Sequence, residues 1–177
     1  MKKEQIRKET ICSRMYRFFL RREPRSWCYN SLWTLFWKPI RKFFSAVVIP
    51  TIPWNGLRIL CYRMCGYKIG SGTFIGMRCY LDDMCYDKMV IGKNVTISYG
   101  CYFACHGRGQ GHNHLVIEDK AYIGMRCSII ARHDHMTIGH HSVVGANSLV
   151  NKDIPAYGVA YGNPVKVQKI QIPINKK

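Results

Sequence analysis

The chain has 177 residues, 47% of them hydrophobic and 12% aromatic, so it is long enough for one ordinary domain and too apolar for a disordered chain. It carries 27 lysines and arginines against 10 acidic residues, has no run of 18 uncharged apolar residues, and has no apolar secretory segment after its basic start. The nine cysteines are odd in number and are interpreted as reduced thiols of a cytoplasmic protein.

Residues 1–53 form a basic, aromatic-rich extension. Residues 1–68 carry a formal charge of +12, whereas residues 69–177 carry +5. The first 25 residues predict an amphipathic helix that ends at Pro24. Basic segments rich in tryptophan are typical of anionic membrane surfaces, so two interpretations stay open: peripheral contact with the inner face of the cell membrane, or a helical lid on neighbouring subunits. Nucleic acid is not expected as a partner, because no stacking motif or known reader fold is present.

Residues 54–68 predict a capping helix. It runs from Trp54 to Cys65, and Gly66 is its expected C-cap. We expect this helix to close the open end of the domain that follows, so that no strand edge is left bare.

Residues 69–155 repeat with a period of six. The repeated aliphatic or aromatic residues are Ile69, Ile75, Leu81, Ile91, Ile97, Phe103, Ile117, Ile123, Ile129, Ile138, Val144 and Val150. Four residues after most of them stands a small side chain: Thr73, Cys79, Val95, Cys101, Ala121, Cys127, Ser142 and Ser148. A short fixed period predicts a solenoid, here with three six-residue sides per coil and the large side chains inside.

The spacing widens only after the third side of a coil, so the three insertions leave the prism at the same corner. They span Asp82 to Val90, Ala104 to Val116, and Ile130 to Thr137. Adjacent coils lie about 4.8 Å apart. Five of the seven histidines and four of the ten acids therefore gather on one edge, where we expect the chemistry.

The middle loop contains the candidate base, His106. A histidine can take a proton from a hydroxyl while that oxygen attacks a thioester, and a carboxylate one coil below, Asp82 or Asp83, can orient the ring. His112 and His114 are candidate acceptor-binding residues. The third loop, with His133, Asp134 and His135, is interpreted as structural, and Cys105 beside His106 is a weaker candidate nucleophile.

The end of the repeat carries a family resemblance. The run from Ile138 to Val167, with VVGANSLVNKDIP and YGNPVKV, resembles the closing coil of bacterial O-acetyltransferases of the maltose/galactoside and colanic-acid type. Leu81-Asp82-Asp83 and Ala104-Cys105-His106 resemble motifs of envelope-polysaccharide members, although Gly107 and Asn147 depart from the family pattern. The resemblance covers about residues 55–170. It implies an all-β, left-handed parallel β-helix of about four coils, a homotrimer, and direct transfer with His106 as base.

The resemblance also implies that acetyl-CoA is the acyl donor. Its contacts, carried over by position, fall on Met125, Ala146, Asn151, Lys152, Lys166 and Lys169. Residues 156–177 would then form a closing segment and tail, in which the two last lysines can meet phosphate groups.

No metal is expected from the sequence. Hexapeptide prisms also resemble gamma-class carbonic anhydrases, but Met125 and Ile130 stand where that family has zinc-binding histidines. Cys61 and Cys65 are spaced too far apart for a CxxC pair. Cys79, Cys101 and Cys127 are expected to stack inside the prism as small apolar residues.

Three functions are compatible with the sequence. The first is acetyl transfer to a sugar hydroxyl, with a lipid-linked sugar of envelope or capsular polysaccharide assembly as the expected acceptor class. The second is transfer to a small molecule, serine or a xenobiotic, although Asp83 replaces the histidine of the serine enzymes' Leu-Asp-His stretch. The third is a β-helix scaffold without catalysis, which would show no rise in melting temperature with CoA.

Overall fold

The computed structural model describes residues 10–23, 32–107 and 112–170, in two units, residues 1–42 and 43–177. In the first unit, α1 (Ile11–Leu20) starts at Thr10, whose hydroxyl accepts the Ser13 N–H while the Ser13 hydroxyl accepts the Thr10 N–H. The helix ends where Arg21 takes a left-handed conformation. The part of the expected N-terminal helix before residue 10 lies outside the described residues.

Three further helical segments lead into the repeat. They are α2 (Leu32–Phe43), a π-helical turn η2 (Phe44–Val48) and a 3₁₀ turn η3 (Ile49–Thr51). The helix α3 (Asn55–Met64) follows, and Gly66 (φ 97°) ends it by donating its N–H to the Arg63 carbonyl. Within the described ranges, no helix is both long and apolar enough to cross a membrane.

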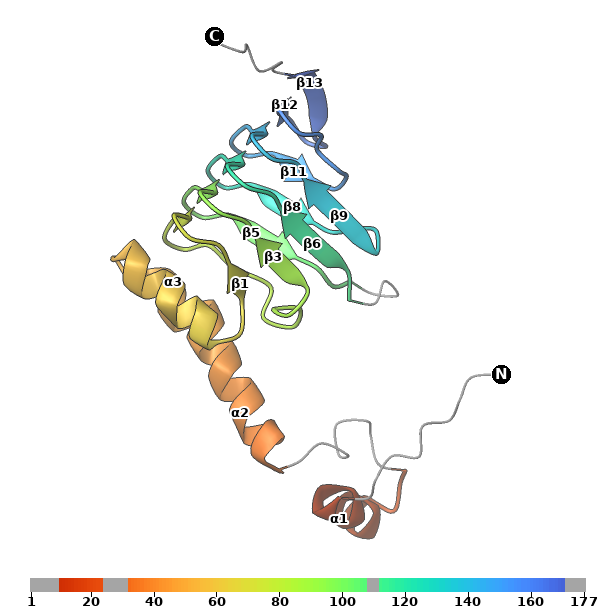
Figure 1. The fold of residues 1–177 in the computed structure, drawn as a ribbon. Helices are drawn as coiled ribbons and strands as arrows, with labels where there is room; N and C mark the ends of the chain where they lie inside the picture. The colour runs from red at the N-terminus through yellow and green to blue at the C-terminus, as the bar shows by residue number, and fades with distance from the viewer. Residues whose placement is uncertain (1–9, 24–31, 108–111, 171–177) are drawn as a thin grey trace. The chain divides into compact units, whose positions relative to one another are not determined.

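The rest of the second unit is a parallel β-solenoid with three faces (Figure 1). Sheet A contains β1 (Lys68–Ile69), β3 (Met89–Ile91), β6 (His114–Ile117) and β9 (His135–Ile138). Sheet B contains β2 (Phe74–Ile75), β4 (Thr96–Ile97), β7 (Tyr122–Ile123), β10 (Val143–Val144), β12 (Gly158–Tyr161) and β13 (Lys166–Ile170). Sheet C contains β5 (Tyr102–Ala104), β8 (Ser128–Ile130) and β11 (Leu149–Val150). The predicted fold, an all-β solenoid of about four coils with a few helices, is confirmed.

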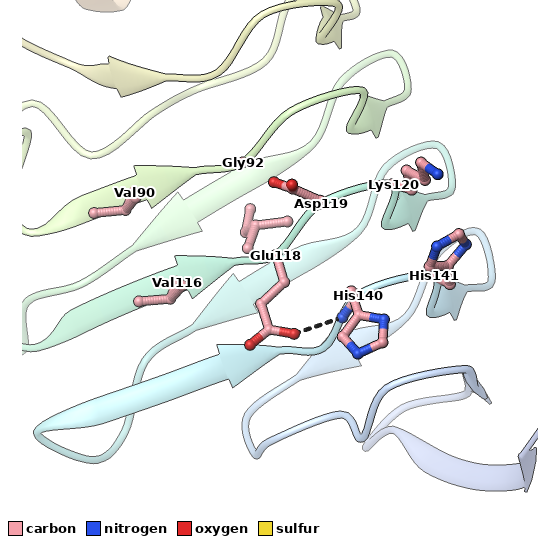
Figure 2. A pocket seen from close by; sticks show the side chains of 9 residues that line it. Val90, Gly92, Val116, Glu118, Asp119, Lys120, His140 and His141 are labelled. Carbon is pink, nitrogen blue, oxygen red and sulfur yellow. Dashed lines mark hydrogen bonds between the residues drawn. The ribbon is translucent and has the colours of Figure 1, made fainter.

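One corner of the prism, between sheets A and B, is tied together by acids (Figure 2). Glu118 accepts the His140 N–H of the next coil (2.7 Å), and Asp119 accepts the Lys93 N–H of the previous coil (2.7 Å). A hollow of about 550 Å³ runs beside these residues along the outside of sheet A. Acidic side chains that follow the repeated aliphatic residue therefore hold neighbouring coils in register.

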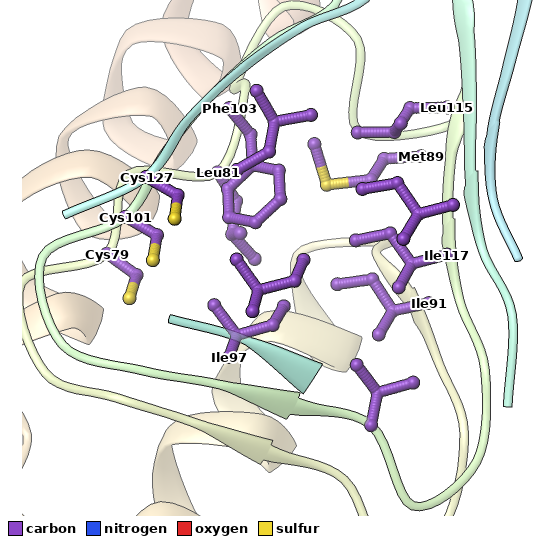
Figure 3. Packing of buried hydrophobic residues seen from close by; sticks show 14 of the residues in the cluster. Cys79, Leu81, Met89, Ile91, Ile97, Cys101, Phe103, Leu115, Ile117 and Cys127 are labelled. Carbon is purple, nitrogen blue, oxygen red and sulfur yellow. The ribbon is translucent and has the colours of Figure 1, made fainter. Parts of the chain in front are cut away.

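The core follows the period of six. All twelve repeat positions are buried, none more than 9% exposed, and so are the eight small residues that follow them. Cys79, Cys101 and Cys127 form the predicted inward stack (Figure 3). Each of these thiols lies 3.0–3.1 Å from a backbone carbonyl oxygen of the next coil, as a weak hydrogen-bond donor. All cysteines in the described ranges are free thiols.

Two of the three corners of each coil use a left-handed residue, three positions after the inward aliphatic residue. These residues are Gly72, Arg78, Asn94, Gly100, Lys120, Arg126, His141, Asn147 and Tyr157, with φ between 52° and 72°. Asparagine is one of the side chains that tolerates this conformation, which explains why Asn147 can replace the family's glycine. Gly124 is needed for a different reason: a Cβ there would lie 2.5 Å from the Ala146 nitrogen.

Side chains of α3 contact the first coil. The buried Arg58 guanidinium donates to the carbonyl oxygens of Ile75 and Ile52. Tyr62 donates its hydroxyl to the Cys79 carbonyl oxygen. The first coil has no earlier coil to pair with, so these side chains donate hydrogen bonds to its exposed carbonyl oxygens.

The last strands close the other end. β12 continues sheet B in parallel with β10, and β13 then turns back to pair with β12 in an antiparallel manner. The sequence predicts only a closing segment and a tail here, because β13 lies outside the six-residue period. The strand still forms because β12 presents an unpaired edge.

Candidate active site

The three insertions leave the prism at one corner, between sheets C and A, as their spacing predicts. The middle one is anchored at its base. The buried Asn113 donates its N–H to the Cys105 carbonyl (2.8 Å) and its side-chain amide to the Ala131 carbonyl (2.7 Å). His106 and His112 face each other across the two arms of this loop as an antiparallel bridge pair.

Asp82 is the carboxylate that holds His106. It is completely buried, and its Oδ2 lies 2.6 Å from the Nδ1 atom of His106. Its Oδ2 also accepts the Cys105 N–H at 2.6 Å, and its Oδ1 accepts the Met84 N–H at 2.9 Å. Two backbone amides therefore fix the carboxylate, and the carboxylate fixes the imidazole.

This arrangement selects one tautomer of His106. A carboxylate only accepts hydrogen bonds, so the Nδ1 atom must carry the proton that Asp82 receives. The lone pair of the neutral ring is then on Nε2, and the side chain is 34% exposed. This geometry is typical of a general base: the Asp82 carboxylate orients the imidazole of His106.

Asp83 is directed elsewhere. It is buried and accepts a hydrogen bond from the Tyr80 hydroxyl, and the Tyr80 ring stacks on Tyr102 with centroids 4.7 Å apart. Burial and the neighbouring Asp83 carboxylate raise the pKa of Tyr80. Asp83 therefore anchors the first loop to sheet C.

The two other candidate histidines have different surroundings. His112 is exposed, and its Nδ1 lies 2.9 Å from the Cys85 thiol. His114 starts β6, stacks on His135 of the next coil (4.6 Å), and lies 3.2 Å from the Lys88 ammonium. Desolvation and the Lys88 charge lower the pKa of His114. His112 thus faces the loop that holds Asp82, whereas His114 joins a ring stack on sheet A.

Two buried thiols lie beside the pair. Burial, followed by the Asp82 carboxylate, raises the pKa of Cys105 to about 12, and the same causes with Asp87 raise that of Cys85 to about 12. Both are 0% exposed. Cys105 is thus a neutral, inaccessible thiol, which argues against its alternative role as a nucleophile.

Sequence reasoning missed Cys85. Asp82, Cys85 and His106 each offer one metal-ligating atom, and these atoms lie within 4.8 Å of one another. The signal was present, because Cys85 stands three residues after Asp82 in the first of the three stacked loops. Cys85 belongs to no CxxC pair, and its histidine neighbours, His106 and His112, come from the next coil.

The candidate acetyl-CoA contacts lie apart from His106 within one chain. Met125 and Ala146 are exposed on successive coils at the corner between sheets B and C, joined through the hydrogen bond from Asn147 N–H to the Met125 carbonyl (2.8 Å). Asn151 and Lys152 follow β11 at the corner of His106, two coils further along. Lys166 and Lys169 are exposed on β13. Sheet C therefore separates Met125 and Ala146 from His106.

The hollow of Figure 2 is a separate feature. Its lining includes Glu118, Asp119, His140 and His141, which belong to the corner between sheets A and B. Its acids are already engaged with backbone amides. Asp82 and His106, by contrast, form a mutually oriented acid and base.

Several curated proteins are similar in sequence, although no family model matches the chain. The bifunctional protein GlmU of a Thermotoga strain is 34% identical over 101 residues, which is 57% of this chain and 21% of that protein. A Bacillus subtilis serine acetyltransferase is 30% identical over 58% of this chain and 48% of its own length. The putative acetyltransferase YvoF of the same species is 27% identical over 78% and 84%. The chain thus spans about a fifth of the GlmU relatives that it matches.

Solved structures agree on the fold. A hexapeptide-repeat-containing acetyltransferase from Vibrio cholerae superimposes with a TM-score of 0.63 at 22% identity, over 80% of this chain and 94% of that one. The same protein has been solved with acetyl coenzyme A (TM-score 0.54). A Neisseria gonorrhoeae serine acetyltransferase matches 68% of this chain and 48% of its own, with a TM-score of 0.54. In sequence and in fold, the chain is similar to hexapeptide-repeat acetyltransferases.

Proposed function

We propose that this protein transfers an acetyl group from acetyl-CoA to a sugar hydroxyl, with His106 as the general base. The observation that carries the proposal is the buried Asp82 carboxylate, 2.6 Å from the Nδ1 of His106 on the loop corner of the solenoid. The similarity to acetyltransferases supports the donor and the reaction type.

The reaction needs no covalent enzyme intermediate. His106 Nε2 removes the proton of the acceptor hydroxyl as its oxygen forms a bond to the acetyl carbonyl carbon. Asp82 stabilises the imidazolium that results. The carbon–sulfur bond then breaks, the proton passes from His106 to the departing sulfur, and free CoA and the acetyl ester are released.

The donor would be held by residues of two chains. Ala146 is small and exposed, so a long, thin ligand can lie along its corner, and the ammonium groups of Lys166 and Lys169 can meet phosphates. Since sheet C separates Ala146 from His106, a complete site requires a second chain to bring its Ala146 corner to the His106 corner of the first. We infer a homotrimer with sites between subunits.

A serine acceptor is the rival. Serine acetyltransferases are among the relatives and the similar structures, and none of the residues around His106 selects a sugar by itself. An acceptor panel must therefore contain L-serine as well as sugars. Turnover with serine alone would replace the sugar proposal and leave the role of His106 intact.

The acceptor class is inferred from the N-terminal helices. In α1, the exposed Ile11, Met15 and Phe18 lie on one face, Arg14 lies at the edge of this face, and Arg17 points away from it. The described part of α2 likewise exposes Phe36, Trp37 and Ile40 beside basic residues. Such helices suit an anionic membrane surface, where lipid-linked sugars reside, so we propose peripheral binding at the cytoplasmic face.

Co-sedimentation with vesicles tests this binding. The full chain should pellet with vesicles that contain anionic lipid, less with neutral ones, and less at high salt. Replacing Phe18 and Phe19 by serine should reduce the bound fraction. A wild-type chain that stayed in the supernatant with both vesicle types would contradict membrane binding, and with it the argument for a lipid-linked acceptor.

A further inference from the structure

Cys85 has no part in the proposed transfer, yet it lies in the middle of the site. It is 0% exposed, and its sulfur is 2.9 Å from the Nδ1 of His112. Its ligating atom, with one atom each of Asp82 and His106, falls within a 4.8 Å cluster. Three side chains from two adjacent loops thus gather a carboxylate, a thiol and an imidazole at one point, and His112 adds a second imidazole beside the thiol.

This set of donors has a specific chemical preference. Cysteine sulfur, histidine nitrogen and aspartate oxygen are the ligands that Zn²⁺ takes in tetrahedral sites. Magnesium and calcium would be poor occupants, because they require mainly oxygen ligands.

We propose that Asp82, Cys85, His106 and His112 bind one Zn²⁺ ion, and that the bound ion switches off the base. Zinc would bind the Cys85 sulfur with loss of its proton to solvent, together with Asp82 Oδ2 and the Nδ1 atoms of both histidines. Bond lengths of about 2.0–2.3 Å put tetrahedral ligand atoms roughly 3.3–3.6 Å apart. The present separations of 2.6 Å and 2.9 Å would therefore widen by about half an ångström to one ångström.

The inhibition follows from the tautomer of His106, and it rests on the proposed function. When Nδ1 binds a metal, the neutral ring must carry its proton on Nε2. The lone pair that removes the acceptor proton is then lost. Zinc therefore competes directly with catalysis at the same imidazole, and its removal restores the active tautomer.

The site is open on one side. His106 is 34% exposed and His112 is exposed, whereas Asp82 and Cys85 are buried. An ion can therefore reach the histidines first and the inner pair afterwards. Both outer ligands belong to the middle loop, so binding would also fix its two arms to the first loop.

Metal binding can be measured without reference to activity. The reduced full-length chain, freed of metal with a chelator, is dialysed against Zn²⁺ or titrated with Co²⁺. We expect one ion per chain and, with Co²⁺, a thiolate-to-metal charge-transfer band. Cys85→Ser should abolish this band and weaken Zn²⁺ binding by about 100-fold or more, and His112→Gln should also weaken binding.

A matched control is available in α3. Cys61→Ser also removes a thiol, but in the capping helix, so it should bind zinc and show the band as the wild type does. Wild type without bound metal, or equal Zn²⁺ affinity in wild type and Cys85→Ser, would overturn the proposal. Loss of binding in His135→Gln alone, with Cys85→Ser unaffected, would place the ion on the surface histidine stack and would also overturn it.

Activity is measured in the same samples. Zinc should suppress CoA release by the wild type, a chelator should restore it, and Cys85→Ser should stay active in zinc that stops the wild type. If Cys85-dependent binding occurs but no acceptor is acetylated, the metal site stands and the transferase proposal fails. If turnover occurs and zinc neither binds nor inhibits, the reverse holds.

Discussion

The carboxylate of Asp82 accepts two backbone amides and one imidazole, so its geometry is determined before any substrate binds. Replacing it by asparagine introduces an NH₂ group that cannot accept these donors. His106 would lose its fixed tautomer.

We predict that Asp82→Asn lowers kcat by about 10²–10⁴-fold, the usual contribution of an oriented general base. Steady-state CoA release measures the effect. Glu118→Gln is the matched control, because Glu118 also accepts a backbone N–H, but at another corner of the prism. Equal rates for Asp82→Asn and the wild type would show that this carboxylate does not orient the base.

A second residue-scale prediction concerns Cys105. Its thiol is buried and neutral, so direct transfer does not use it. Cys105→Ala should keep kcat within about threefold of the wild type, since deletion of one small buried group costs only about 1 kcal/mol of stability. A trapped acetyl thioester on Cys105, or complete loss of turnover in a folded Cys105→Ala, would instead establish a covalent route.

The sequence could nominate His106 as the candidate base, but it could not decide which carboxylate lies beside it. Asp82 and Asp83 are adjacent, and which of them turns toward the histidine depends on the backbone of the first loop. The Asp82 carboxylate is held by the Met84 amide, two residues away, and by the Cys105 amide, 23 residues away on the next coil. Cys85 was missed for a related reason, because its neighbours come from the next coil.

At the scale of elements, α3 supplies hydrogen-bond donors to the first coil of the solenoid. Without α3, these donors would have to come from the backbone of another coil. Arg58 is 1% exposed and bonds two carbonyl oxygens, one of them in β2. We predict that Arg58→Met lowers the free energy of unfolding by about 2–5 kcal/mol, because it leaves buried acceptors unpaired. Denaturant titration measures this change.

The control lies one turn along the same helix. Arg63 donates to the carbonyl oxygens of Ile69 and Gly70 from an exposed position. Water can replace it there, so Arg63→Met should cost about 1 kcal/mol or less. Similar losses for the two variants would mean that Arg58 is not specifically required as a cap.

The stacked interior makes a comparable prediction. Ile123 is completely buried between Ile97 and Val144 of the adjacent coils. Ile123→Ala should lower the free energy of unfolding by about 2–5 kcal/mol. Lys93→Ala, at an exposed corner, should change it by no more than about 0.5 kcal/mol. A small effect of Ile123→Ala would mean that the coils can collapse around the lost volume.

The repeat was the most predictable element. The repeated aliphatic residue of each six-residue unit marks the side chain that points inward. The positions of the sheets, corners and loops therefore follow from the spacing of these residues. β13 was not predictable, because it has no hexad and pairs only through the edge that β12 leaves. The handedness of the coil came from the family resemblance and not from the period.

At the scale of the whole molecule, the separation of His106 from Ala146 by sheet C has a direct consequence. If sites lie between chains, His106→Ala and Ala146→Trp each disable a different half of the site. Reassociation of equal amounts of the two dissociated variants should restore about a quarter of the wild-type activity in the whole population, because one site in each mixed trimer combines two intact halves. No recovery in verified mixed trimers would place each site within one chain.

The most direct test of the account is CoA release from acetyl-CoA by the wild type and His106→Ala, across a panel of sugars and L-serine, with CoA binding measured in parallel. We predict turnover with at least one acceptor by the wild type, a loss of about 10²-fold or more in His106→Ala, and unchanged CoA binding. Equal turnover by the two proteins would contradict the assignment of the base. Absence of CoA binding by the folded wild type would contradict the transferase itself.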